Sequence, residues 1–120
     1  MAETTITPTL LTKAGSDGVV ITPGAGTAIN TANTMIVAYP KNSKLLLTID
    51  SNHADTVATI AASDFAIEAG LGAVTYAVGD TVEHLLVVPD QARVRKADGN
   101  IDITWATNSA GFVTAWYLPK

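Results

Sequence analysis

The amino-acid sequence predicts an all-β protein, a single small β-sandwich of the jelly-roll or immunoglobulin-like type with about eight strands and an extended N-terminal arm. Short runs rich in Val, Ile, Thr and aromatic residues alternate with turn-forming residues at spacings of about 8 to 12 residues, which is typical of sandwiches and small barrels. The chain of 120 residues is 48% apolar and 15% charged, so it can bury one hydrophobic core but not two. We expect an arm at residues 1–13 and the sandwich domain at residues 14–120.

The first half of the chain contains the arm and the earlier strands. The first ten residues show no two-residue alternation and contain Pro8, which rules out a central strand and favours an extended arm. The expected strands that follow cover residues 19–22, 34–39, 43–50 and 56–60. Residues 61–71 are ambiguous, because Ser63 or Asp64 can cap a short helical turn that Gly70 would end.

The second half contains expected strands at residues 73–78, 81–88, 92–96, 101–105 and 112–118. Asp98-Gly99 is the strongest hairpin signal in the chain, since both central positions of a type I′ turn need a positive φ. Ile101, Ile103 and Trp105 alternate with polar residues and are expected to face the core. The last strand is apolar on both faces, so we expect it to be central or covered by a partner. The predicted core includes Val37, Leu46, Ile60, Leu86, Ile103 and Phe112.

Composition and charge exclude several classes of function. A net charge of −4 gives no general attraction for phosphate backbones, so no nucleic acid is expected as a ligand. The sequence has no cysteine, which excludes disulfides, thiolate zinc sites and cysteine nucleophiles. We expect neither a secretory signal nor a membrane protein, because no apolar run approaches the roughly 20 residues that span a bilayer.

Candidate catalytic residues are few. His53 lies between Asp50 and Asp55, which suggests a metal or acid–base site, but these residue types also build turns by bonding to nearby backbone groups. His84 lies within a β-rich run and is interpreted as an exposed strand position. No P-loop and no nucleophile-elbow motif occurs in the sequence, so we expect no enzyme activity and no cofactor or metal.

Two groups of residues suggest a binding surface. Arg93 and Arg95 would share one face of the predicted strand at 92–96 and meet carboxylates on another protein, although charge also protects edge strands from pairing with other chains. Trp105, Trp116 and Tyr117 either form a platform for sugars or belong to the core.

The order of segments resembles that of the small auxiliary head proteins of tailed bacteriophages, the decoration or cement proteins. The resemblance covers nearly the full length of the chain. In the first half it is carried by a threonine-rich opening at residues 6–11, a Gly/Ala/Asn-rich stretch before a strand at 25–37 and the alternating segment at 56–60. In the second half it is carried by an apolar strand ending in proline at 85–89, the Ala-Asp-Gly-Asn-Ile-Asp-Ile-Thr segment at 97–104 and a final strand beginning at 111–115. Residues 65–69 depart from the pattern.

The resemblance implies a structural virion protein that is made in the host bacterial cytoplasm and then binds the outer capsid surface. Its partners would be the major capsid protein and copies of itself, with a trimer favoured, and the arm would lie across a neighbouring subunit. The alternatives are a β-sandwich adhesion or carbohydrate-binding module and a phage tail or baseplate component. The expected capsid or subunit interface contains Ile6, Pro8, Leu10, Leu11, Arg93, Arg95, Trp116 and Tyr117.

Overall fold

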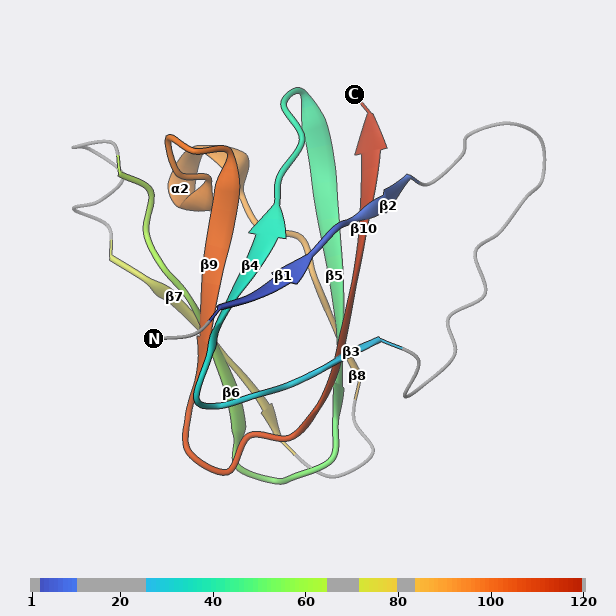
Figure 1. Ribbon diagram of the computed structural model, residues 1–120, viewed down its shortest axis with the longest axis vertical. Coiled ribbons are helices and arrows are strands. Elements are labelled where there is room, and N and C mark those ends of the chain that lie inside the picture. The colour runs from blue at the N-terminus through green and yellow to red at the C-terminus, as the bar shows by residue number, and fades with distance from the viewer. Residues whose placement is uncertain (1–2, 11–25, 65–71, 80–83, 120) are drawn as a thin grey trace.

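The computed structural model describes residues 3–10, 26–64, 72–79 and 84–119, and these residues form an all-β protein, as predicted (Figure 1). The only helix in these ranges is the four-residue α2 (Gln91–Val94), so the described residues contain no helix that could cross a membrane. The strands are β1 (Glu3–Ile6), β2 (Thr9–Leu10), β3 (Thr27–Ala28), β4 (Thr34–Ala38), β5 (Ser43–Ser51), β6 (Thr56–Ile60), β7 (Val74–Gly79), β8 (His84–Val87), β9 (Asn100–Trp105) and β10 (Gly111–Pro119).

The strands form two mixed sheets. The first sheet has the order β1-β4-β9-β6-β7, and the second has the order β2-β10-β5-β8, with β3 also pairing with β10. Only the pairs β1–β4 and β2–β10 are parallel among the described strands. Of the described strands, only β2–β3 and β6–β7 are successive strands in the same sheet, and the chain changes sheet between all other successive strands. Most strands that follow each other in sequence therefore lie in opposite sheets.

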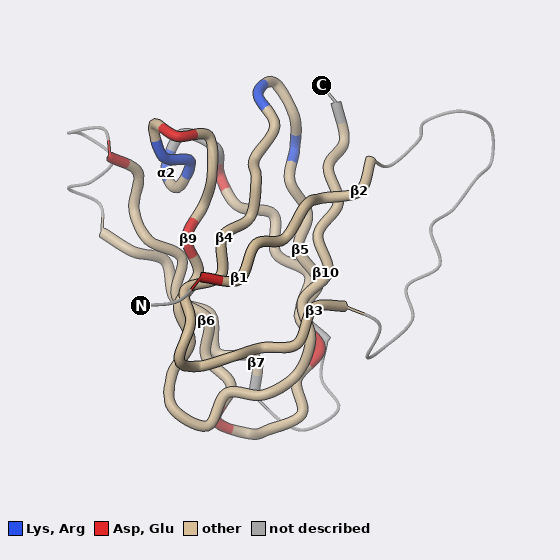
Figure 2. The backbone as a smooth tube through the Cα atoms, viewed as in Figure 1, with Lys and Arg blue, Asp and Glu red and all other residues tan. Residues whose placement is uncertain are grey.

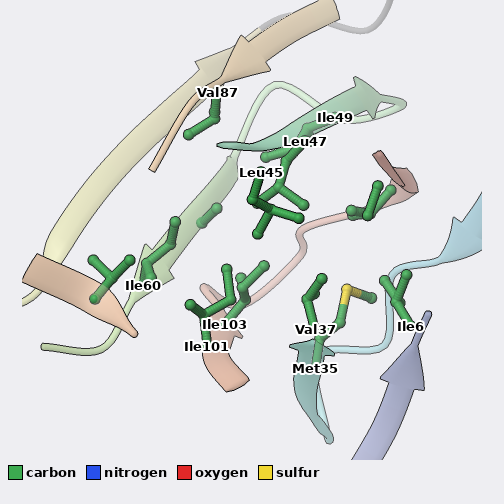
Figure 3. Packing of buried hydrophobic residues seen from close by; sticks show 14 of the residues in the cluster. Ile6, Met35, Val37, Leu45, Leu47, Ile49, Ile60, Val87, Ile101 and Ile103 are labelled. Carbon is green, nitrogen blue, oxygen red and sulfur yellow. The ribbon is translucent and has the colours of Figure 1, made fainter. Parts of the chain in front are cut away.

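Both sheets contribute to one hydrophobic core, in which alternate residues of the longer strands point inward (Figure 3). Ile101, Ile103 and Trp105 share the core face of β9, which confirms the prediction from their alternation. The largest fully buried apolar side chains are Met35, Val37, Ile60, Val94, Ile101 and Ile103 on one side of the core or at its end and Leu45, Leu47, Ile49 and Val113 on the other.

The predicted core is half right. Val37, Ile60 and Ile103 are buried, whereas Leu46 and Phe112 are only partly buried and Leu86 is 60% exposed. Leu47 and Val87 are paired and face the core. Leu46 and Leu86, which precede them in β5 and β8, therefore lie on the opposite face of the second sheet. Apolar residues occupy both faces of these strands, so alternation in the sequence does not show which face is inside.

The predicted strand at 92–96 is wrong, because residues 91–94 form α2 instead. The Asp90 carbonyl accepts hydrogen bonds from the backbone N–H groups of Arg93 (3.0 Å) and Val94 (3.1 Å). The turn at Asp98-Gly99 forms where predicted, with Gly99 at φ 88°, but Asp98 does not have a positive φ, so the turn is not of type I′. The predicted β-hairpin around this turn is wrong, because α2 rather than a strand precedes it and only β9 follows it. The predicted strand at 19–22 and the ambiguous residues 65–71 lie outside the described residues.

The N-terminal residues differ most from the prediction. Residues 3–10 are extended, but they are part of the two sheets: β1 pairs with β4, and the chain then crosses to the second sheet, where β2 pairs with β10 (Figure 1). Both strands lie at sheet edges, which agrees with the exclusion of a central position. The expected boundary between residues 13 and 14 lies outside the described residues.

Candidate functional site

The N-terminal residues of the predicted interface are mostly used inside the protein itself. Ile6 is 6% exposed and belongs to the core cluster, and Pro8 is also buried. Leu10 is 45% exposed at the edge of the second sheet, and Leu11 lies outside the described residues. Of the three predicted residues here that the structure describes, only Leu10 has an exposed side chain.

Arg93 and Arg95 do not form a pair on one strand face, because Arg93 belongs to α2 and Arg95 follows it. The Nε of Arg95 donates a hydrogen bond of 2.9 Å to the carbonyl of Tyr39, so this guanidinium helps to close one end of the molecule. At the same end, the Nζ of Lys96 lies 2.9 Å from the Oδ2 of Asp102. This hydrogen bond is the main reason that the pKa of Lys96 is raised above 10.5.

All the described lysines and arginines lie at this end of the molecule, around α2 and the turn between β4 and β5 (Figure 2). Acidic residues occur at the same end. The Oδ2 of Asp64 accepts a hydrogen bond of 3.2 Å from the backbone N–H of Ala97, which follows Lys96. Asp90, Asp98 and Asp102 are close in sequence to the basic residues. Positive and negative charges are therefore mixed here, and this end does not form a purely basic surface.

Burial affects one further titratable group at the same end. The Tyr39 hydroxyl donates a buried hydrogen bond of 2.9 Å to the Pro89 carbonyl. Burial raises the pKa of Tyr39 above its ordinary value of 10.0; Asp90 adds to the increase, while the Leu45 backbone and Arg95 oppose it. This hydroxyl joins the segment before α2 to the end of β4.

The aromatic residues do not gather on one exposed surface. Trp105 is part of the core, and Tyr117 packs against the core from β10. Trp116 follows on the opposite face of the same strand and is 7% exposed. These side chains therefore do not form the flat, exposed platform that a sugar ring would need.

The residues around His53 form a structured turn, which confirms the interpretation as a turn. The Nδ1 of His53 accepts a hydrogen bond of 3.0 Å from the backbone N–H of Asp55, and the Oγ of Ser51 donates one of 2.8 Å to the His53 carbonyl. The backbone of His84 pairs with Asp50 in the second sheet. Among the described residues, no cluster of three or more His, Asp or Glu side chains is arranged to hold a metal ion.

The most exposed large apolar side chains lie along one edge of the second sheet. Leu86 is 60% exposed, and Val88, directly after β8, is 48% exposed. The pairing of Leu86 with Thr48 places Leu86 on the face of the sheet that carries the partly buried Leu46. We call these three residues the β8 surface. Residues 85–89 carry no charge, although edge strands are commonly protected by charged side chains. The sequence shows this uncharged run but not which of its residues face outward.

Comparison with known proteins finds no family model, no curated protein and no solved structure that matches the chain. The geometry of the fold and of the β8 surface is therefore the basis for a functional proposal.

Proposed function

We propose that the protein is a structural virion protein without enzymatic activity, which binds the outer surface of a tailed-bacteriophage capsid and reinforces the lattice of the major capsid protein. The β8 surface carries the proposal. Exposed aliphatic side chains on an uncharged edge strand gain free energy when a partner removes them from water. The choice of partner is supported by the order of segments along the chain, which resembles that of decoration proteins.

The fold supports a reinforcing role. We infer that the two sheets form a β-sandwich, and the repeated crossing between sheets is a feature that jelly-roll and immunoglobulin-like folds share. The crossing of residues 3–10 from one sheet to the other ties the sheets together along one side (Figure 1). A body joined in this way resists deformation when it connects neighbouring capsid subunits.

The contact with each capsid subunit would be small. Leu86, Val88 and Leu46 cover much less than the roughly 800 Å² per partner of a standard interface. Self-association, with a trimer at local threefold positions preferred, would let several weak contacts act together. The proposed partners are thus the major capsid protein and further copies of this chain, at the outer surface of the virion after synthesis in the bacterial cytoplasm.

The alternatives have less support. An adhesion or carbohydrate-binding module would use exposed aromatic side chains, whereas Trp105 and Trp116 are buried and Tyr117 packs against the core. A tail or baseplate component would also use an apolar contact surface, but the resemblance in segment order is to head proteins.

Capsid binding by matched variants tests the proposal. Purified protein is mixed with undecorated, expanded capsids of its phage and sedimented. We expect Leu86→Asp to weaken binding by about tenfold or more, which corresponds to about 1.4 kcal/mol per contact. Thr75→Asp is the control, because Thr75 is exposed on β7, the edge strand of the first sheet. Equal binding by both variants would remove the β8 surface from the interface, and specific binding of the protein to a glycan array without binding to capsids would favour the adhesion module.

A further inference from the structure

Residues 3–10 lie in the structure as a bound peptide would. β1 pairs only with the edge of β4, and β2 pairs only with the edge of β10, among the described strands. Addition of an extended segment to a sheet edge is a common way for one chain to bind another. The edges of β4 and β10 and the core residues between them hold this segment, and we call them the groove.

Two buried side chains anchor the segment in this groove. Ile6 lies beside Val37 and Met35 in the core (Figure 3), and Pro8 is buried where the chain crosses between the sheets. The Nδ2 of Asn33 also donates a hydrogen bond of 3.0 Å to the Oγ1 of Thr4. The groove therefore recognises this segment by apolar side chains, a polar side chain and the backbone.

The length of the connecting chain permits a second arrangement. Residues 11–25 join the segment to the rest of the protein, and a connection of this length spans up to about 50 Å when extended. The longest dimension of the molecule is 39 Å. The segment can therefore reach the same groove in an adjacent copy.

We propose that residues 3–10 are exchanged between copies, so that the segment of one copy occupies the groove of the next. Exchange preserves every contact of the segment, and the free-energy difference between the two arrangements comes mainly from association and from the connecting chain. A high local concentration of copies favours exchange. The inference rests on the proposed function in one respect: a decorated capsid would supply the high local concentration of copies. On such a capsid, exchange would link neighbouring copies of the protein to one another.

Disulfide cross-linking between two differently sized chains tests exchange without capsids. The protein has no cysteine, so introduced thiols have no competitors. Thr5 and Ile36 are directly paired in the β1–β4 register, and neighbouring strands lie about 4.8 Å apart, within the range that a disulfide needs. One chain carries Thr5→Cys and the other, with a longer tag, carries Ile36→Cys. The two are unfolded, refolded together at high concentration and oxidised.

We expect a disulfide-linked heterodimer at a yield at least about fivefold above that of a collision control, in which Thr5→Cys is mixed with Lys41→Cys at an exposed turn. A heterodimer yield no greater than in this control overturns the proposal. A single chain with both Thr5→Cys and Ile36→Cys verifies the geometry by forming this disulfide, either internally or with another copy. Failure to form it in either way would also contradict the proposal, because the groove would not hold the segment. Cross-linking in a protein that does not bind capsids would leave exchange intact and refute decoration.

Discussion

Truncation of Ile6 tests whether the N-terminal segment is a structural part of the domain. Ile6 is 6% exposed and is paired with the fully buried Val37. Replacing a buried isoleucine by alanine costs about 2–5 kcal/mol, through lost burial and the cavity that remains. Because β1 is an edge strand, we expect Ile6→Ala to lower the free energy of unfolding by about 2–3 kcal/mol, a large part of the roughly 5–15 kcal/mol of a typical domain.

Urea unfolding followed by tryptophan fluorescence measures this loss, since Trp105 and Trp116 are both buried. With a denaturant slope of about 2 kcal/mol/M, the midpoint should fall by about 1–1.5 M. Thr5→Ala is the control, because Thr5 is the exposed neighbour and its replacement should change stability by about 0.5 kcal/mol or less. Equal midpoints for the two variants would refute the reasoning and restore residues 3–10 as an arm that is independent of the fold.

Three further predictions concern stability. Gly111 has φ 141°, and a Cβ there would collide with the Asp50 carbonyl oxygen. Gly111→Ala should therefore lower the free energy of unfolding by about 3 kcal/mol or prevent folding. A urea midpoint equal to that of the wild type would contradict the β5–β10 register. Tyr39→Phe should cost about 1 kcal/mol at pH 7 by removing a buried hydrogen bond. Since burial raises the pKa of Tyr39 in the folded state, its contribution is complete below pH 10.0 and is lost as the pH rises through the raised pKa. Unfolding midpoints from pH 8 to 11 should therefore fall less steeply for Tyr39→Phe than for the wild type, and parallel curves would refute this. A double-mutant cycle on Lys96→Met and Asp102→Asn at pH 7 should give a coupling of about 0.5 kcal/mol, and a coupling above about 2 kcal/mol would contradict the view of a partly exposed ion pair.

The predictions from sequence were most successful where one face of a strand is polar. In β9 the isoleucines alternate with Asp102 and Thr104, so the buried face could be identified. In β8 and at the start of β5 both faces are apolar, and only the pairing of the strands decides that Leu86 faces outward. The exposed surface proposed to bind the capsid was therefore beyond what alternation can predict.

The other errors arise from contacts between distant residues. Residues 91–94 form α2 in a segment that reads as a strand, and Val94 is fully buried while Arg95 bonds to Tyr39 at the same end of the core. The docking of residues 3–10 depends on two sheet edges that are formed by residues much later in the chain. A segment with one buried isoleucine has no periodicity of its own from which its pairing could be predicted.

Cryo-electron microscopy of undecorated, expanded capsids incubated with the purified full chain tests the central claim most directly. The account predicts new density of the size of this domain on the outer surface at the local threefold positions, with the β8 surface against the major capsid protein. Bare capsids after incubation with excess protein would contradict capsid decoration, and density in which Leu86 and Val88 point into solvent would contradict the proposed interface.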